Sequence, residues 1–191
     1  MRSVPRTKLT RLRLGGTATI LAGLCYGAAG YLDRAGISEF TNALVSVLSV
    51  AIPAFSLGGL LGLHTRLLLA SRTGLASGVG FVLGCFGSVL GIVGGLGSAR
   101  PPYSQITVWW WVPLLAGLTL IGLFSCLKGG LRLLGTVVSI SGAIGWVSLL
   151  TDPAFSGVLV PMRSVHVVFA AAFCCSAVVW GLVLMVPHEN R

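Results

Sequence analysis

The sequence predicts an all-α fold: a polytopic transmembrane helical bundle of six spanning helices, forming one domain over residues 1–191 with both termini cytoplasmic. Six strongly apolar stretches each reach the roughly 20 residues that a helix needs to cross a bilayer. Of all residues, 55% are hydrophobic and 9% are charged, whereas a soluble domain carries about a quarter charged residues. The cations also gather on alternate sides of the predicted spans, as expected for a membrane protein.

The predicted spans follow one another with short connections between them. They cover residues 14–32, 42–63, 74–98, 106–127, 131–150 and 165–186. At roughly 20 residues each they use about 120 positions, which leaves two short tails and five short loops. No soluble catalytic domain fits into these segments. Any activity is therefore expected within the membrane, at its surfaces or in a partner.

The first span follows a basic N-terminal segment, a pattern that it shares with signal peptides. Its apolar run of about 19 residues is longer than a typical signal-peptide core, and five further spans follow. We therefore expect an uncleaved membrane anchor.

Proline lies within the second and the fourth predicted spans, at Pro53 and Pro113. Each proline removes one backbone donor and is expected to kink its helix. Broken helices mark solute sites in some transporters, although kinks that serve packing alone are commoner. The sequence leaves open whether either kink lines a cavity.

The third span carries a helix-packing seam of small residues at alternating spacings of three and four. The seam consists of Ser77, Gly80, Gly84, Gly87, Gly91, Gly94 and Ser98. In lipid, close approach of backbones at small residues drives helix association. The spacing fits a left-handed crossing and the G-x-x-x-G pairs within it fit a right-handed one, so the handedness stays open. We expect this helix at the centre of the bundle, and packing within the chain is favoured over self-association.

Cations are distributed unevenly between the two sides of the predicted bundle. With both termini inside, ten of the 13 lysines and arginines are cytoplasmic, as the positive-inside rule expects. Topology and attraction to anionic headgroups therefore explain the net charge of +9 better than nucleic-acid binding does. The lipid bilayer is the expected partner, and no nucleic acid is expected.

Tryptophan and tyrosine lie near the predicted span ends and indicate an interfacial girdle. The girdle residues are Tyr31, Tyr103, Trp109, Trp110, Trp111 and Trp146 on the outside and Trp180 on the inside. Successive helical residues point about 100° apart, so the three consecutive tryptophans are not expected to line one pocket together.

Few residues suggest chemistry within the spans. No acidic or basic residue lies at mid-depth, which disfavours an ion-coupled transporter. His64 and His166 lie on opposite sides of a roughly 30 Å core and cannot share a haem, and His64 with Arg66 is expected to anchor a helix end in the headgroups. The five cysteines include no C-x-x-C pair and should pack as small apolar residues. We predict no catalytic residue, no cofactor and no metal.

One mixed cluster of charged side chains is predicted on the outer loops. It consists of Asp33, Glu39, Arg100, Asp152, Arg163 and His166. Acids with a histidine could bind a metal or act in acid–base catalysis, but salt bridges between loops are the commoner reason for such a set.

The layout of the chain resembles a loose group of uncharacterised small six-span bacterial integral membrane proteins. The features in common are the basic start, the segment Gly58-Gly59-Leu60-Leu61-Gly62-Leu63-His64-Thr65-Arg66, the glycine-rich third span that follows a basic linker, and Trp180-Gly181. The resemblance covers the whole chain and implies a bacterial inner membrane. It brings no active site with it.

Three functions remain open. A non-enzymatic scaffold or accessory subunit, bound to other membrane subunits or to itself through small-residue faces, is favoured by the seam and by the lack of charges within the membrane. A carrier or channel for a neutral or lipid-like solute predicts a cavity near mid-depth beside Pro53 or Pro113. A membrane-embedded enzyme predicts that Asp33, Asp152 and His166 lie within reach of one point.

Overall fold

The computed structural model describes residues 6–35, 39–70, 74–97, 109–127, 131–151 and 163–186. Within these ranges the side chains of residues 6, 30, 33–35, 39–42 and 163–166 are outside the description. The described residues form α1 (Arg6–Ala35), α2 (Glu39–Leu69), α3 (Leu75–Gly97), α5 (Trp111–Leu127), α6 (Arg132–Thr151) and α8 (Arg163–Met185). The all-helical fold class is thereby confirmed.

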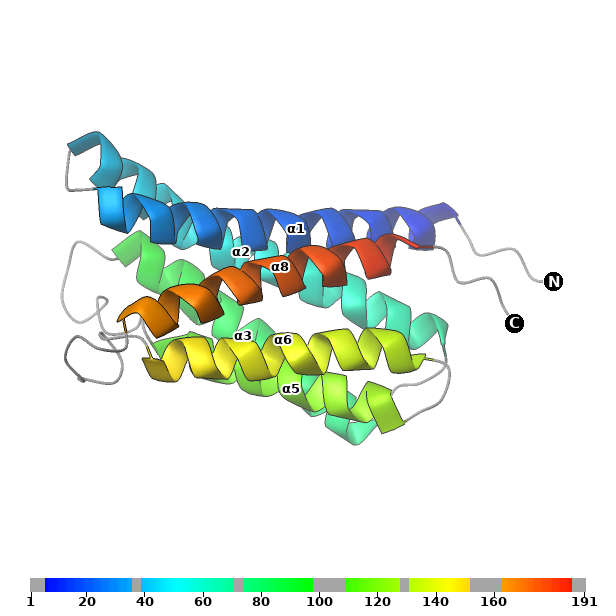
Figure 1. Cartoon of the computed structure of the whole chain (residues 1–191). Coiled ribbons are helices and arrows are strands. Elements are labelled where there is room, and N and C mark those ends of the chain that lie inside the picture. The colour runs from blue at the N-terminus through cyan, green and yellow to red at the C-terminus, as the bar shows by residue number, and fades with distance from the viewer. Residues whose placement is uncertain are drawn as a thin grey trace.

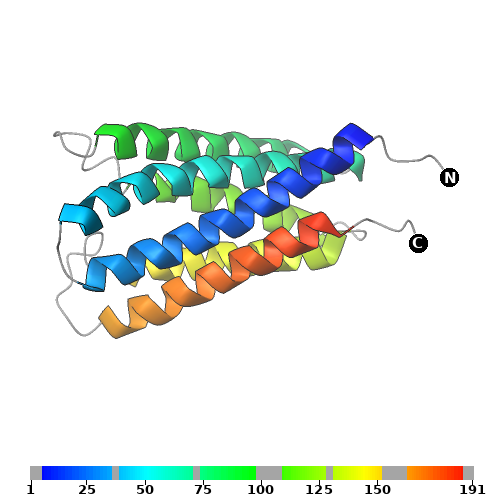
Figure 2. The ribbon, with the colours of Figure 1, turned by 90° about the horizontal axis from the view of Figure 1, so that it is seen from above.

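The six helices form a closed ring. Each helix packs against the next one along the chain, and α8 packs against α1 to close the ring. Consecutive helices run in opposite directions, so that α1 begins and α8 ends at the same end of the bundle (Figures 1 and 2). A smaller contact joins α2 to α8 across the ring. Within the described residues, therefore, no helix occupies the centre, and the expectation that the third span lies there is wrong.

Four of the helices are long and apolar enough to cross a membrane. The candidate spans are Ala43–Leu69, Leu75–Gly97, Arg132–Thr151 and Val167–Met185, and the shorter apolar helix is Trp111–Leu127. Large apolar side chains are exposed on every helix, including Leu24, Leu61, Val82, Leu123, Leu133 and Leu182. A soluble monomer rarely exposes so much apolar surface, whereas lipid covers it without penalty.

Small residues bring the helices of the ring close together. On α3, Ser77, Gly80, Gly84, Gly87, Gly91 and Gly94 are buried, and Ser98 lies outside the described residues. A Cβ at Gly87 would lie 2.6 Å from the backbone nitrogen of Leu114 in α5, and one at Gly84 would lie 2.9 Å from Leu60 in α2. The seam thus faces into the bundle, while Val82 and Phe86 on the opposite face of α3 are exposed.

The two prolines differ in their effects. Pro113 is the third residue of α5, in the first turn, where a proline disturbs no hydrogen bond within α5. A turn at Trp110 separates the helical residue Trp109 from the start of α5, and the kink expected from Pro113 stays a prediction. Pro53 lies inside α2 and has no N–H to donate to the carbonyl of Ser49. Gly95 of α3 lies against this carbonyl, at a place where a Cβ would approach its oxygen to 2.9 Å.

Candidate functional site

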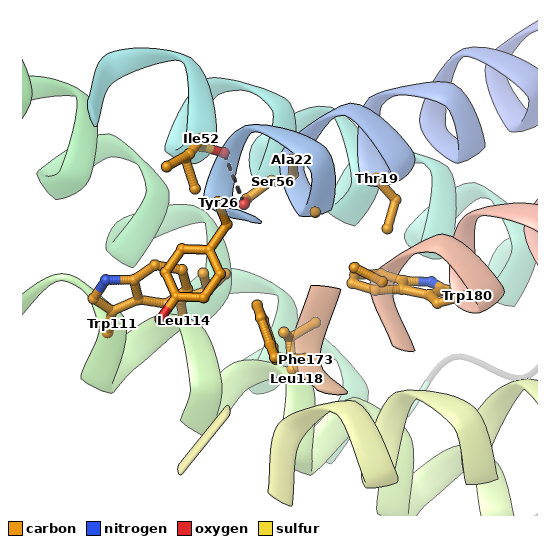
Figure 3. A pocket seen from close by; sticks show the side chains of 12 residues that line it. Thr19, Ala22, Tyr26, Ile52, Ser56, Trp111, Leu114, Leu118, Phe173 and Trp180 are labelled. Atoms are coloured by element: carbon orange, nitrogen blue, oxygen red, sulfur yellow. Dashed lines mark hydrogen bonds between the residues drawn. The ribbon is translucent and has the colours of Figure 1, made fainter. Parts of the chain in front are cut away.

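A small cavity lies halfway along the bundle, inside the ring. Its volume of about 20 Å³ suffices for a single water molecule. Four helices line it, namely α1, α2, α5 and α8 (Figure 3). The lining residues are Thr19, Ala22, Gly23, Tyr26, Ile52, Ser56, Trp111, Leu114, Leu118, Phe173, Ala177 and Trp180. Ile52 and Leu114 are the immediate neighbours of the two prolines.

Helical spacing explains how one face of α8 reaches the cavity. Phe173, Ala177, Trp180 and Leu184 follow one another at steps of four, three and four, and each is at most 9% exposed. Residues at this spacing share one face of a helix. The first three line the cavity, so the interior face of α8 carries two aromatic rings separated by one alanine.

An aromatic group closes one part of the cavity wall. Tyr26, Trp111 and Phe173 come from α1, α5 and α8 and pack edge to face (Figure 3). Their ring centroids lie 5.1 Å apart for Tyr26 and Trp111, 5.7 Å for Tyr26 and Phe173 and 5.9 Å for Trp111 and Phe173. Edge-to-face pairs at such distances are attractive beyond their burial, so this group joins three helices of the ring.

The hydroxyl groups at the cavity already have partners within the protein, and two of them donate to their own helices. Thr19 Oγ1 donates to the carbonyl of Gly15 and Ser56 Oγ to that of Ile52, each at 2.9 Å. The Tyr26 hydroxyl lies 3.4 Å from Ser148 Oγ of α6. A hydroxyl that donates to its own helix keeps oxygen lone pairs as acceptors. Thr19 and Ser56 can therefore accept a hydrogen bond from a molecule in the cavity.

Trp180 carries a buried N–H at the end of its ring that lies away from Tyr26 and Phe173 (Figure 3). Its side chain is 6% exposed, and its Nε1 is the one buried side-chain nitrogen or oxygen in the described part of the chain that lacks a hydrogen-bond partner. A buried N–H without an acceptor costs about 1–3 kcal/mol. Such a group in a native structure calls for an explanation, for example a bound molecule.

Three tryptophans do not take the positions that the predicted interfacial girdle requires. Trp109 is 59% exposed, but Trp110 is 4% and Trp180 is 6% exposed, and Trp111 lines the cavity and stacks on Trp110. The girdle interpretation is therefore wrong for Trp110, Trp111 and Trp180. A residue near a helix end reaches the headgroups only when its helix face points outward, and the spacing of Trp180 from Phe173 was the signal of an inward face.

The structure leaves the predicted outer cluster untested. Asp33, Glu39, Arg100, Asp152, Arg163 and His166 all lie outside the residues whose side chains are described. At the other end of the bundle, His64 stacks on Phe81 of α3 with ring centroids 4.2 Å apart, and Arg66 is only 8% exposed. His64 therefore contacts α3, and Arg66 is buried although it lies only three residues before the end of α2 at Leu69. The expectation that the two side chains anchor the helix end in the headgroups stays a prediction.

Known proteins provide no further guide to this site. Comparison with protein-family models, with curated proteins and with solved structures finds no match for the chain. The resemblance to six-span bacterial membrane proteins stays a prediction. The functional argument therefore rests on the geometry of the cavity.

Proposed function

We propose that this protein crosses a bacterial inner membrane six times, with cytoplasmic termini, and that its helix ring binds and carries a small neutral solute. The observation that supports the proposal is the cavity at mid-length, which is lined by the residues next to Pro53 and Pro113. A carrier needs such a site near the middle of the bilayer, where it is reached in turn from either side.

The positions of α1 and α5 in the ring support the proposal that these two helices also cross the membrane, although neither is a candidate span by length and composition. At about 1.5 Å per residue, the 17 residues of α5 extend about 26 Å, close to the hydrocarbon thickness of about 30 Å. In the ring, α5 packs between α3 and α6, and α1 packs between α2 and α8. Each therefore lies between two candidate spans and shares their surroundings.

The lining defines the class of solute. Among the described residues, the side chains at the cavity are aromatic, aliphatic or hydroxyl-bearing, and none is charged. An ion placed there would lose its hydration without gaining a counter-charge, which is strongly unfavourable. A neutral molecule with an apolar body and one or two polar atoms matches this lining. Because the cavity holds only one water-sized body, passage of a larger solute requires movement of the surrounding side chains or helices.

The accessory-subunit interpretation remains an alternative proposal, with weaker support. This interpretation rests mainly on the small-residue seam. The described seam residues, however, pack against α2 and α5 of the same chain and are therefore not available to another subunit. Binding of other subunits would then use the apolar outer faces. The molecular mass of the protein purified in mild detergent distinguishes the cases: a larger assembly supports the accessory role, and a monomer counts against it.

A flux assay with a matched pair of variants tests the carrier proposal. Ala22 lines the cavity and Ala28 is exposed on the same helix, so Ala22→Ile fills the hollow whereas Ala28→Ile adds the same atoms on the lipid side. Liposomes containing the protein are exposed to gradients of water, urea, formamide, glycerol and acetone, and their volume is followed by light scattering.

We expect the unaltered protein and Ala28→Ile to accelerate at least one solute at least tenfold over protein-free liposomes, and Ala22→Ile to remove the acceleration. Thermal unfolding of both variants checks that they are folded. If no solute crosses faster than in protein-free liposomes, the carrier proposal fails.

A further inference from the structure

We propose that the ring consists of two three-helix units that move against each other, with the cavity on the boundary between them. One unit contains α8, α1 and α2, and the other contains α3, α5 and α6. The junction of α6 with α8 opens, and the junction of α2 with α3 acts as the pivot near the end of the bundle where α2 begins. The inference rests on the carrier proposal, since it names the movement that gives a solute access to the cavity.

In the first unit, glycines bring the backbones of neighbouring helices into direct contact. A Cβ at Gly62 of α2 would lie 2.7 Å from the Cα of Gly15 in α1. A Cβ at Gly181 of α8 would lie 2.6 Å from the carbonyl oxygen of Gly16 in α1. Such close backbone contacts supply the dispersion attraction that holds helices together in lipid. We therefore expect α8, α1 and α2 to move as one body.

The second unit is joined in the same way, with α5 in the middle. A Cβ at Gly117 of α5 would lie 2.6 Å from the backbone nitrogen of Gly84 in α3. A Cβ at Gly122, further along α5, would lie 2.6 Å from the backbone nitrogen of Ser139 in α6. Helix α5 therefore holds α3 and α6 as closely as α1 holds α2 and α8.

The junction of α6 with α8 is less extensive than the interfaces within the units, and its described glycine contact is made to a side chain. A Cβ at Gly145 of α6 would lie 3.0 Å from Cε2 of Phe173 in α8. The long contact of 3.4 Å between the hydroxyl oxygens of Tyr26 and Ser148 also crosses from the first unit to the second. Side-chain contacts are broken and remade by changes of rotamer, which backbone contacts do not allow. The units therefore separate most easily here.

The junction of α2 with α3 differs between its two ends. Near the beginning of α2, a Cβ at Gly95 of α3 would lie 2.9 Å from the carbonyl oxygen of Ser49, which Pro53 leaves without its usual donor in α2. Toward the other end, His64 of α2 and Phe81 of α3 meet through stacked side chains. A junction held by backbone at one end and by side chains at the other can open as a hinge does, so the contact of Gly95 with Ser49 is the pivot.

The cavity is shared by the two units. Its lining comes from α1, α2 and α8 of the first unit and from α5 of the second. Within the aromatic group, Trp111 belongs to the second unit and meets Tyr26 and Phe173 of the first edge to face (Figure 3). Separation of the units would part the cavity wall between these rings and leave each unit intact. A site between two moving bodies is reached in turn from either side, as a carrier requires.

The experiment measures distances between pairs of spin labels by double electron–electron resonance, with the protein in lipid nanodiscs. Each label is attached to a keto-bearing amino acid, so that the five native cysteines stay in place. The labelled positions carry large apolar side chains that are more than half exposed. Leu133 and Leu182 span the junction of α6 with α8, and Val47 and Leu96 span the pivot. Leu14 and Leu182 form the matched control pair within the first unit.

Each pair is measured without solute and with glycerol, which is one of the solutes of the flux assay. We expect the Leu133–Leu182 distribution to show two maxima, or to be at least about twofold wider than the Leu14–Leu182 distribution, because two bodies take two arrangements. The Val47–Leu96 distribution should be as narrow as the control. Thermal unfolding of each labelled protein checks that it is folded.

Three results would overturn the proposal. Equal widths for all three pairs under both conditions would show that the ring does not divide into two moving units. A Leu14–Leu182 distribution as wide as that of Leu133 and Leu182 would show that α1 and α8 are not one body. A Val47–Leu96 distribution of that width would refute the pivot.

Failure of this inference can be told apart from failure of the carrier proposal. If Leu133 and Leu182 keep a single narrow distance under both conditions while a solute crosses in the flux assay, the carrier proposal stands and the two-unit movement is refuted. If the units move but no solute crosses faster than in protein-free liposomes, the movement stands and the carrier proposal is refuted.

Discussion

The interface between α3 and α5 and the wall of the cavity use opposite residue sizes within one ring. At the interface, glycine faces glycine: a Cβ at Gly117 would lie 2.6 Å from the backbone nitrogen of Gly84. At the cavity, Tyr26, Trp111 and Phe173 meet edge to face. Small residues let backbones touch and leave no space between them, whereas rigid rings that meet at their edges leave a gap that no side chain fills. Small residues, among them Ala22, Gly23 and Ala177, also line the hollow, so the bundle is solid where glycine meets glycine and hollow where small residues face bulky rings.

The largest expected effect comes from breaking the solid region with Gly87→Leu. A Cβ at this position would meet backbone atoms of α5, the nitrogen of Leu114 at 2.6 Å and the carbonyl oxygen of Trp110 at 2.8 Å, so the two helices must separate. We expect a loss of about 3 kcal/mol of stability, measured as a lower thermal unfolding midpoint in mild detergent.

Gly78→Leu is the matched control on the same helix. A Cβ there has no neighbour within 4 Å, so the free energy of unfolding should change by less than about 0.5 kcal/mol. The unfolding midpoint should accordingly stay close to that of the unaltered protein. Equal losses in Gly87→Leu and Gly78→Leu would refute the proposed difference between the two faces of α3.

The next largest effect should come from enlarging the hollow region with Phe173→Ala. This change removes the edge-to-face contacts of Phe173 with Tyr26 and Trp111 and extends the cavity. Lipid supplies no hydrophobic drive between helices, so the loss of packing alone should cost about 2 kcal/mol.

Thermal unfolding measures the loss, and xenon binding, followed by ¹²⁹Xe NMR, should increase as the hollow grows. Phe86→Ala is the control, because Phe86 is 57% exposed on the outer face of α3 and its removal should change neither quantity. Unchanged xenon binding in Phe173→Ala would contradict the assignment of Phe173 to the cavity wall.

The smallest effect is expected from Tyr26→Phe, which keeps the ring and removes the hydroxyl. The hydroxyl lies 3.4 Å from Ser148 Oγ, at the long end of a hydrogen bond, so its loss should lower stability by about 1 kcal/mol or less. Tyr31→Phe removes an exposed hydroxyl and should leave the unfolding midpoint in place. A loss as large as that of Phe173→Ala would show that the hydroxyl, and not the ring, holds this part of the wall.

The candidate site shows how far helical periodicity carries a prediction. The seam from Ser77 to Gly94 was recognisable because its spacing places small residues on one face, and that face is buried. The same reasoning was available for Phe173, Ala177 and Trp180, but the position of Trp180 near a span end suggested the headgroups instead. Periodicity identifies which residues share a face. It contains no information on whether that face meets lipid, a neighbouring helix or a hollow.

By itself, the sequence determined the helical class, the approximate extent of each helix and the apolar outer surface, because these depend on hydrogen bonding and solvation along a single segment. Only the tertiary structure decided that the helices close into a ring, that Pro113 lies in a first turn and that Trp180 lines a cavity. These properties arise from contacts between segments distant in the chain, and the fit of side chains across an interface cannot be read from either segment alone.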